Sequence, residues 1–181
     1  MIYGERIRLR RDERADIPRF VEWLNDPDVR RYLSMNLPIS QANEEQWFDN
    51  TLKRPREEQP FAIEIKDNDN WRIIGNCGFM NIDWTVHSAE VGLFIGDKTC
   101  WNRGYGTEVM QLLIRHGFDS LNLNRIFLRV DEDNRSGIRA YEKAGFIQEG
   151  RCRQAGYRDG RYNDVLIMSF LRSESKMKNK R

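Results

Sequence analysis

The sequence predicts a mixed α/β domain with one central sheet, on three observations. Short apolar or alternating runs, which are typical of strands, recur along most of the chain. A segment after the middle of the chain carries apolar residues at helical spacing. The length of 181 residues suits one domain with one core. We therefore expect a single domain over residues 1–172 and a basic tail over residues 173–181.

The N-terminal region, residues 1–60, combines one strand with helices. Residues 6–10 alternate and indicate an edge strand. Asp16 is a candidate N-cap of the first helix, and an Asn-Asp-Pro turn ends that helix. Ser40 opens a clearer helix, whose apolar face extends to Leu52. The expected helices here cover residues 16–24, 28–33 and 40–52.

The rest of the chain combines strands with two helices. Residues 67–70 and the pair Asp159-Gly160 indicate turns between strands. Gly145 is placed to end the second helix, with Phe146 folding back as its apolar contact. The apolar stripe of the first helix consists of Met110, Leu113, Ile114, Gly117, Phe118 and Leu121. The expected strands cover residues 61–65, 73–82, 89–95, 124–130, 146–154 and 163–171.

Composition and charge argue against several classes of protein. Thirty basic and 28 acidic residues nearly balance, so no broad nucleic-acid surface is indicated. No apolar run approaches the length of a membrane span, and the N-terminus has no signal-peptide core. The three cysteines, Cys77, Cys100 and Cys152, indicate neither a disulfide framework nor a zinc site. These features predict a cytoplasmic protein without a metal.

A glycine-bearing loop, residues 101–107, lies between a predicted strand and a predicted helix. Unpaired amides and the positive end of the helix dipole favour an anion there, commonly a phosphate. Gly104 and Gly106 can adopt positive φ, which lets a ligand approach the backbone closely. The spacing matches neither the P-loop nor the dinucleotide fingerprint, so a plain turn is the alternative.

A second segment, residues 133–146, reads Asp-Asn-Arg-Ser-Gly-Ile-Arg-Ala-Tyr-Glu-Lys-Ala-Gly-Phe. Together with the loop it resembles the GNAT superfamily of acetyl-CoA-dependent N-acetyltransferases, which have a pyrophosphate loop and an N-x-x-S-x-x-x-Y-x-K-x-G-F helix. Trp101 stands where many members have Gln or Arg, a pattern associated with the RimJ/RimL-type branch of ribosomal-protein N-acetyltransferases. The resemblance covers most of the chain. It implies a mostly antiparallel, splayed central sheet of about seven strands flanked by helices.

The resemblance also implies how acetyl-CoA would be held. The loop would bind the pyrophosphate, and a backbone N–H near residues 93–95 would polarise the thioester carbonyl. Asn134 would bind the pantetheine arm, cap the following helix, or do both. The candidate contacts are Leu93, Phe94, Ile95, Asn102, Arg103, Gly104, Tyr105, Gly106, Thr107 and Asn134.

Two residues are candidates for the proton transfers. Tyr141 resembles the family's tyrosine, and a phenol with a pKa of about 10 keeps a proton that a leaving thiolate can accept. The alternative is a core tyrosine on the same helix face as Ile138. Glu90, an acid within an apolar strand, is the candidate base. Its alternatives are a solvent-facing glutamate and deprotonation by water.

The acceptor amine is left open. A protein N-terminal amine has a pKa of about 7.7–8.0 and needs little help to lose its proton. A polyamine, amino sugar or aminoglycoside would favour converging carboxylates, and the available acids are Glu44, Glu45, Asp83 and Asp159. A non-catalytic acyl-CoA-binding module is the alternative of another class. We expect a monomer or homodimer with neither a membrane nor a nucleic acid as partner.

Overall fold

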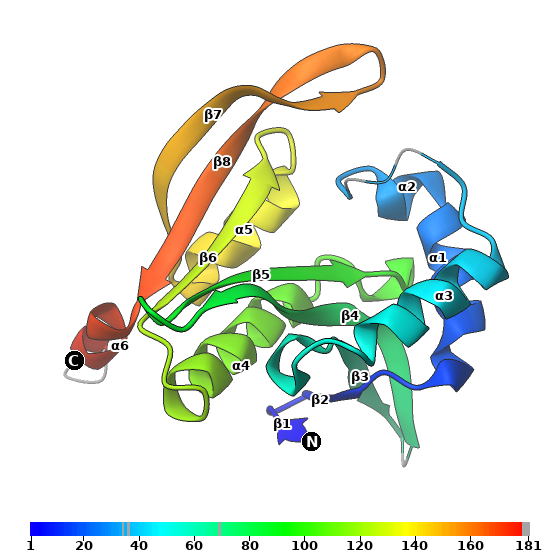
Figure 1. The fold of residues 1–181 in the computed structure, drawn as a ribbon, viewed down its shortest axis with the longest axis horizontal. Coiled ribbons are helices and arrows are strands. Elements are labelled where there is room, and N and C mark those ends of the chain that lie inside the picture. The colour runs from blue at the N-terminus through cyan, green and yellow to red at the C-terminus, as the bar shows by residue number, and fades with distance from the viewer. Residues whose placement is uncertain (34, 36, 69, 179–181) are drawn as a thin grey trace. The chain divides into compact units, whose positions relative to one another are not determined.

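The computed structural model describes residues 1–33, 35, 37–68 and 70–178 and has a mixed α/β fold (Figure 1). The strands are β1 Ile2–Tyr3, β2 Ile7–Arg11, β3 Phe61–Asp67, β4 Asn70–Asp83, β5 Ser88–Ile95, β6 Arg125–Asp131, β7 Ile147–Arg158 and β8 Arg161–Leu171. The α-helices are α1 Ile17–Asn25, α2 Pro27–Arg30, α3 Gln41–Thr51, α4 Tyr105–Asp119, α5 Arg135–Ala144 and α6 Arg172–Lys178.

Within the described residues the strands pair in one 8-stranded sheet, in the order β1-β2-β3-β4-β5-β6-β8-β7. β5 and β6 are parallel, whereas β1–β2, β2–β3, β3–β4, β6–β8 and β7–β8 are antiparallel. The prediction of a mostly antiparallel sheet flanked by helices is therefore confirmed. The expected edge strand over residues 6–10 is wrong in one respect, because β1 pairs with Arg8 and Leu9 of β2. Two residues are too few for alternation to reveal β1 in the sequence.

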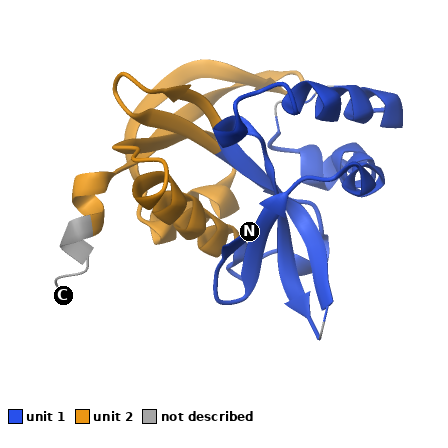
Figure 2. Cartoon of the chain, turned by 60° about the horizontal axis from the view of Figure 1, so that its bottom comes forward, with its two compact units in different colours: residues 1–79, 92–105 blue, residues 80–91, 106–181 orange. Residues whose placement is uncertain are grey.

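Two compact units make up the chain (Figure 2). The first contains residues 1–79 and 92–105, and the second contains residues 80–91 and 106–181. β4 and β5 each begin in one unit and end in the other. Neither unit is therefore one continuous segment of chain. A single domain over residues 1–172 stays a prediction, and helix α6 includes the first residues of the expected tail.

In the first unit, helix α1 packs its apolar face against neighbouring helices and strands. Phe94 of β5 lies edge-on to Phe20 of α1, with 6.2 Å between ring centroids. The cluster comprises Phe20, Trp23, Leu24 and Val29, with Leu33, Met35, Ile39, Ile73 and Phe94 packed against it. Ser40 caps α3 as predicted, because its Oγ accepts the amide of Asn43 at 3.2 Å. The C-terminal end of β5 is thus anchored on α1.

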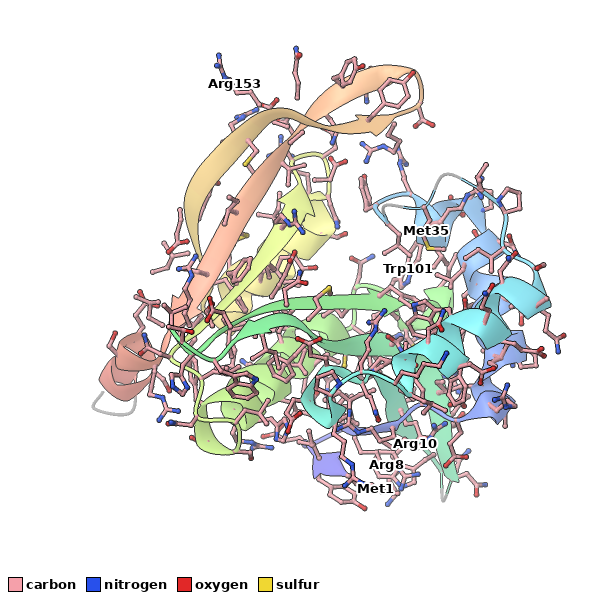
Figure 3. All side chains as sticks on the ribbon, in the orientation of Figure 1. Met1, Arg8, Arg10, Met35, Trp101 and Arg153 are labelled. Atoms are coloured by element: carbon pink, nitrogen blue, oxygen red, sulfur yellow. The ribbon has the colours of Figure 1, made fainter. Side chains whose placement is uncertain are left out.

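Two expectations about the helices are wrong. Asp16 precedes α1 but does not cap it, because both carboxylate oxygens accept from the Arg10 guanidinium at 2.7 Å. Arg10 and Arg8 alternate with buried residues and project from the same face of β2 (Figure 3). The Asp16 carboxylate therefore binds the charged side chain of Arg10 and does not accept a backbone amide at the start of α1. Leu52 lies beyond α3 and is 53% exposed, whereas Phe48 is buried.

In the second unit, a row of aromatic rings joins α4, α5 and β8. Phe118 stacks on Phe170 at 5.9 Å between centroids, Phe170 contacts Phe146 at 6.2 Å, and Phe146 contacts Tyr141 at 6.2 Å. The predicted stripe of α4 is confirmed except for Leu121, which lies outside the helix. The buried residues of α4 are Val109, Met110, Leu112, Leu113, Ile114, Gly117 and Phe118.

The hairpin formed by β7 and β8 turns where the sequence predicted. Asp159 and Gly160 have φ angles of 51° and 78°, as a type I′ turn requires. Arg158 pairs with Arg161 across this turn. β7 ends four residues later and β8 begins two residues earlier than the alternating patterns indicated, because paired backbone continues through polar positions that carry no hydrophobic signal.

Candidate functional site

The loop before α4 has the backbone geometry of an anion-binding site. Asn102 and Gly104 have positive φ angles of 58° and 84°. The amides of Asn102, Arg103 and Gly104 donate to no described residue. Successive unpaired amides before a helix N-terminus are suited to a phosphate. Residues 101–104 are exposed, so water also satisfies these donors in a plain turn, and the phosphate-binding role stays a prediction.

Two side chains of the first unit hold this loop. The Trp101 indole N–H donates to the carbonyl of Ile95 at 2.8 Å, which ties the loop to the end of β5. Arg6 donates to the carbonyl of Arg103 at 3.1 Å, and its guanidinium lies 4.7 Å from the Tyr105 ring centroid. Sequence reasoning missed Arg6, because no local pattern links residue 6 to this loop.

The first turn of α4 belongs to the second unit from Gly106 onward. Gly106 lies in α4 and does not use the positive φ that glycine can adopt, whereas Gly104 does. A Cβ at Gly106 would lie 3.9 Å from the Ala140 Cβ, and the Thr107 hydroxyl donates to the Ala140 carbonyl at 3.3 Å. These contacts pack the start of α4 closely against α5.

Helix α5 has the boundaries that the second motif predicted. The Asn134 side chain accepts the Gly137 amide at 2.9 Å, which confirms its capping role. Gly145 has a φ of 113°, and the Phe146 amide donates to the Tyr141 carbonyl at 3.0 Å. This is the left-handed helix ending that glycine permits.

Tyr141 lies on α5 with its ring against Phe146. Burial raises the pKa of its phenol to about 12. The hydroxyl has no hydrogen-bond partner among the residues that the structure describes. The side chain therefore keeps its proton at neutral pH and has a free donor, although the same ring also packs as the core alternative proposed.

Glu90 is buried, with 7% of its surface exposed, so the solvent-facing alternative is wrong. Its carboxylate accepts from Arg129 Nε at 2.8 Å and Nη2 at 3.1 Å, and from Asn81 Nδ2 at 3.1 Å. Charge-assisted hydrogen bonds of this kind fix the orientation of the carboxylate. To take a proton from an amine, Glu90 must give up part of this network. Arg129 and Asn81 were missed because their partner is separated from them in the sequence.

The remaining candidates serve local roles. Glu45 accepts from Gln41 at 2.9 Å, and Asp83 accepts the amides of Thr85 and Val86 at 2.8 and 3.3 Å. The Asp159 side chain is 79% exposed at the hairpin turn. Among the described residues, no group of three or more His, Cys, Asp or Glu side chains is arranged to hold a metal. No helix within the same ranges is both long and apolar enough to cross a membrane.

Comparison with known proteins agrees with this geometry. Residues 6–147 match the family model described as "Acetyltransferase (GNAT) domain". The chain belongs to the GNAT family of acetyltransferases. It is 34% identical over 175 residues to "Uncharacterized N-acetyltransferase p20" of Bacillus licheniformis, a match that covers 96% of this chain and 97% of that protein. This GNAT protein is an N-acetyltransferase, and its cosubstrate is acetyl-CoA.

Two further similarities concern one kind of GNAT enzyme. The chain is 27% identical over 171 residues to the spermidine N(1)-acetyltransferase of Vibrio cholerae, covering 94% of this chain and 96% of that protein. The crystal structure of spermidine N-acetyltransferase from Vibrio cholerae with CoA and spermine matches with a TM-score of 0.85 and 25% identity. That match covers 94% of this chain and 98% of the other.

Proposed function

We propose that the acceptor is a primary amine of a small aliphatic polyamine. The observation that supports this proposal is similarity to spermidine acetyltransferases over nearly the whole chain, in sequence and in structure. The structural similarity covers 94% of this chain. A polycation also favours carboxylates, and Glu44 is a buried acid of the first unit with no ion-pair partner among the described residues.

Each chemical requirement of acetyl transfer has a proposed residue. Bound acetyl-CoA supplies the acetyl group as a thioester. Residues 102–107 would hold the pyrophosphate through backbone amides, Asn134 would bind the pantetheine arm, and an amide of residues 93–95 would polarise the carbonyl. The amine nitrogen bonds to the carbonyl carbon, the carbon–sulfur bond breaks, and Tyr141 donates its proton to the thiolate.

Glu90 is proposed as the acceptor of the amine proton, directly or through water. Burial brings the carboxylate out of bulk solvent, and Arg129 holds its orientation. The Arg129 side chain is 60% exposed, so its guanidinium remains in contact with solvent while it is bound to Glu90. A proton transfer to Glu90 is then followed by release of the proton to solvent.

The predicted RimJ/RimL-type assignment remains a second proposal, supported by Trp101 at the start of the loop. In that branch the acceptor would be a protein N-terminal amine. Reduced, unpaired cysteines at positions 77, 100 and 152 agree with the proposed cytoplasmic location. The oligomeric state, monomer or homodimer, is part of the same proposal.

The acceptor class is tested by release of free thiol from acetyl-CoA with a panel of polyamines, amino sugars, aminoglycosides and peptides with free N-termini. We expect turnover with spermidine-like amines at the lowest concentrations. Turnover restricted to peptide N-termini would overturn the polyamine proposal in favour of the RimJ/RimL-type one. Mass spectrometry of the product would identify the acetylated nitrogen.

A further inference from the structure

Arg6 lies in the turn between β1 and β2, and the surrounding backbone holds it there. The Gly4 amide donates to the Ile7 carbonyl at 2.9 Å across this turn, and the Lys66 amide donates to the Arg6 carbonyl at 3.4 Å. Ile7, the next residue, is fully buried. The pairing of β1 with β2 therefore fixes the position from which the Arg6 side chain extends.

The Arg6 guanidinium lies against the loop before α4, although 97 residues separate Arg6 from Arg103 in the sequence. Its Nη1 donates to the Arg103 carbonyl at 3.1 Å. Its central carbon lies 4.7 Å from the centroid of the Tyr105 ring, which is a cation–π distance. Its Nη2 lies 3.4 Å from the position that a Cβ on Gly104 would occupy. One side chain thus lies against three consecutive residues, and all of them belong to the first unit.

The hydrogen bond to the Arg103 carbonyl fixes the direction of the next amide. This carbonyl and the Gly104 N–H belong to the same peptide unit, which is planar and trans. In a trans unit the C=O and N–H bonds point in opposite directions. Because Arg6 binds the carbonyl on one side, the Gly104 N–H points to the other side, where no described residue accepts it.

The same contact strengthens the Gly104 N–H as a donor. A positive charge on a carbonyl oxygen polarises the peptide unit, and linked hydrogen bonds strengthen one another. It also holds the carbonyl oxygen, which would repel an anion, away from the side that the amide faces. Asn102 and Gly104 have positive φ angles, whereas Arg103 between them does not. Turns of this kind direct successive amides into a concavity that suits an anion.

A contribution to stability alone gives Arg6 little to do. The hydrogen bond to Arg103 is exposed, so water competes for both groups and the net gain to the fold is small. A loop that is already arranged for its ligand loses less freedom on binding, and that gain appears in affinity. The contacts of Arg6 are therefore better explained by ligand binding than by folding.

We propose that Arg6 is a positioning residue for the pyrophosphate of acetyl-CoA and acts through the Gly104 amide, an inference that rests on the proposed role of this loop. Arg6 anchors the Arg103 carbonyl, and the Gly104 N–H is thereby aimed and polarised toward a phosphate oxygen. The cation–π contact with Tyr105, the first residue of α4, restricts the guanidinium to this place. The short strand β1 then has a function, because it holds the turn that carries Arg6.

Calorimetric titration with CoA tests this proposal without a reaction. We expect Arg6→Ala to bind CoA about tenfold more weakly than the wild type, as for loss of a hydrogen bond to a charged group. Arg6→Lys keeps a charged donor and should recover part of the affinity. Arg14→Ala is the matched control, because Arg14 is also exposed and lies 5.2 Å from the centroid of the Phe48 ring. The control should bind CoA as the wild type does.

A truncated thioester separates positioning of the pyrophosphate from damage to the fold. Acetyl-pantetheine carries the same acetyl thioester but has no pyrophosphate. In Arg6→Ala, kcat/KM with acetyl-CoA should fall about tenfold, whereas kcat/KM with acetyl-pantetheine should stay within about twofold of the wild-type value. An equal fall with both thioesters would show that Arg6 only supports the fold, and would overturn the proposal.

The NMR resonance of the Gly104 amide reports the proposed contact directly. On addition of CoA the amide proton should move downfield in the wild type, as a new hydrogen bond to an anion requires, and should move less in Arg6→Ala. Wild-type movement and wild-type CoA affinity in Arg6→Ala would refute the role of Arg6.

Gly104→Val separates this inference from the proposed role of the loop. Loss of CoA affinity in Gly104→Val but not in Arg6→Ala would retain the loop and remove only Arg6. Wild-type affinity in both folded variants would refute the loop and Arg6 together. Because CoA binding is measured without an amine, neither result depends on the acceptor class.

Discussion

The contacts that shape α5 join near neighbours in the sequence, whereas the carboxyl groups of Asp12 and Glu90 are held by residues from other strands. Asn134 caps a helix three residues away, and Tyr141 accepts the amide of Phe146. Asp12 depends on Asn76, and Glu90 depends on Arg129. The geometry of α5 follows from residue type and from spacing along the chain. The chemistry of the Asp12 and Glu90 carboxyl groups depends on the residues that surround them after folding.

This difference predicts two kinds of response to substitution. A change in a local motif should act on one defined step, such as cofactor binding or proton donation. A change in a carboxyl group that is held by residues of other strands should alter the pH dependence of the reaction or the stability of the fold. Burial and hydrogen-bond partners determine the ionisation of such a group. Four variants test this contrast, and their expected effects range from a large loss of cofactor affinity to a small change in stability.

Gly104→Val should weaken acetyl-CoA binding at least about 100-fold, through loss of several charge-assisted backbone contacts. Gly104 has a φ of 84°, which a β-branched residue resists, so the loop must rearrange. Calorimetric titration with acetyl-CoA measures the loss. Gly160→Val imposes similar strain at a φ of 78° in the hairpin turn and should leave affinity unchanged. If folded Gly104→Val protein bound acetyl-CoA as tightly as the wild type, the loop would be a plain turn with no role in binding the pyrophosphate.

Tyr141→Phe should lower kcat by at least about tenfold, because general acid–base catalysis typically contributes about 10²–10⁴-fold. Ring packing on Phe146 is retained, so acetyl-CoA affinity and thermal stability should change little. Steady-state thiol release measures kcat. Tyr162→Phe removes an exposed hydroxyl and serves as the control. Full activity of Tyr141→Phe would leave Tyr141 with a packing role only.

Glu90→Gln should reduce kcat/KM most at low pH and partly recover as pH rises, because free amine then accumulates without a base. The reduction should be smaller than that of Tyr141→Phe if water shares the proton transfer. A pH–rate profile on a verified acceptor measures it. Glu149→Gln is the matched control, since Glu149 also pairs with an arginine of β6, at 2.6 Å. An unaltered profile in Glu90→Gln would assign deprotonation to solvent.

Asp12→Asn should have the smallest effect, a gain in stability at high pH. Because the folded pKa of Asp12 is raised from 3.8 to about 7, its contribution to stability is complete below 3.8 and lost as pH rises through about 7. The variant should therefore exceed the wild-type Tm by about 3 °C at about pH 8 and by much less at about pH 5. Thermal unfolding at both pH values measures this, with the exposed Asp49→Asn as control.

The sequence by itself determined the order of the strands and helices from β2 to β8, the glycine loop before α4, the limits of α5 and the family. Those features depend on periodicity, caps and turn residues, which act between neighbours along the chain. Only the tertiary structure decided that Asp16 binds Arg10 rather than capping α1, that Gly106 is helical, and that Glu90 is paired. It also decided that one oxygen of the Asp12 carboxyl is buried without a hydrogen-bond partner among the described residues. Burial and charge pairing depend on segments that meet only after folding, so no local pattern contains them.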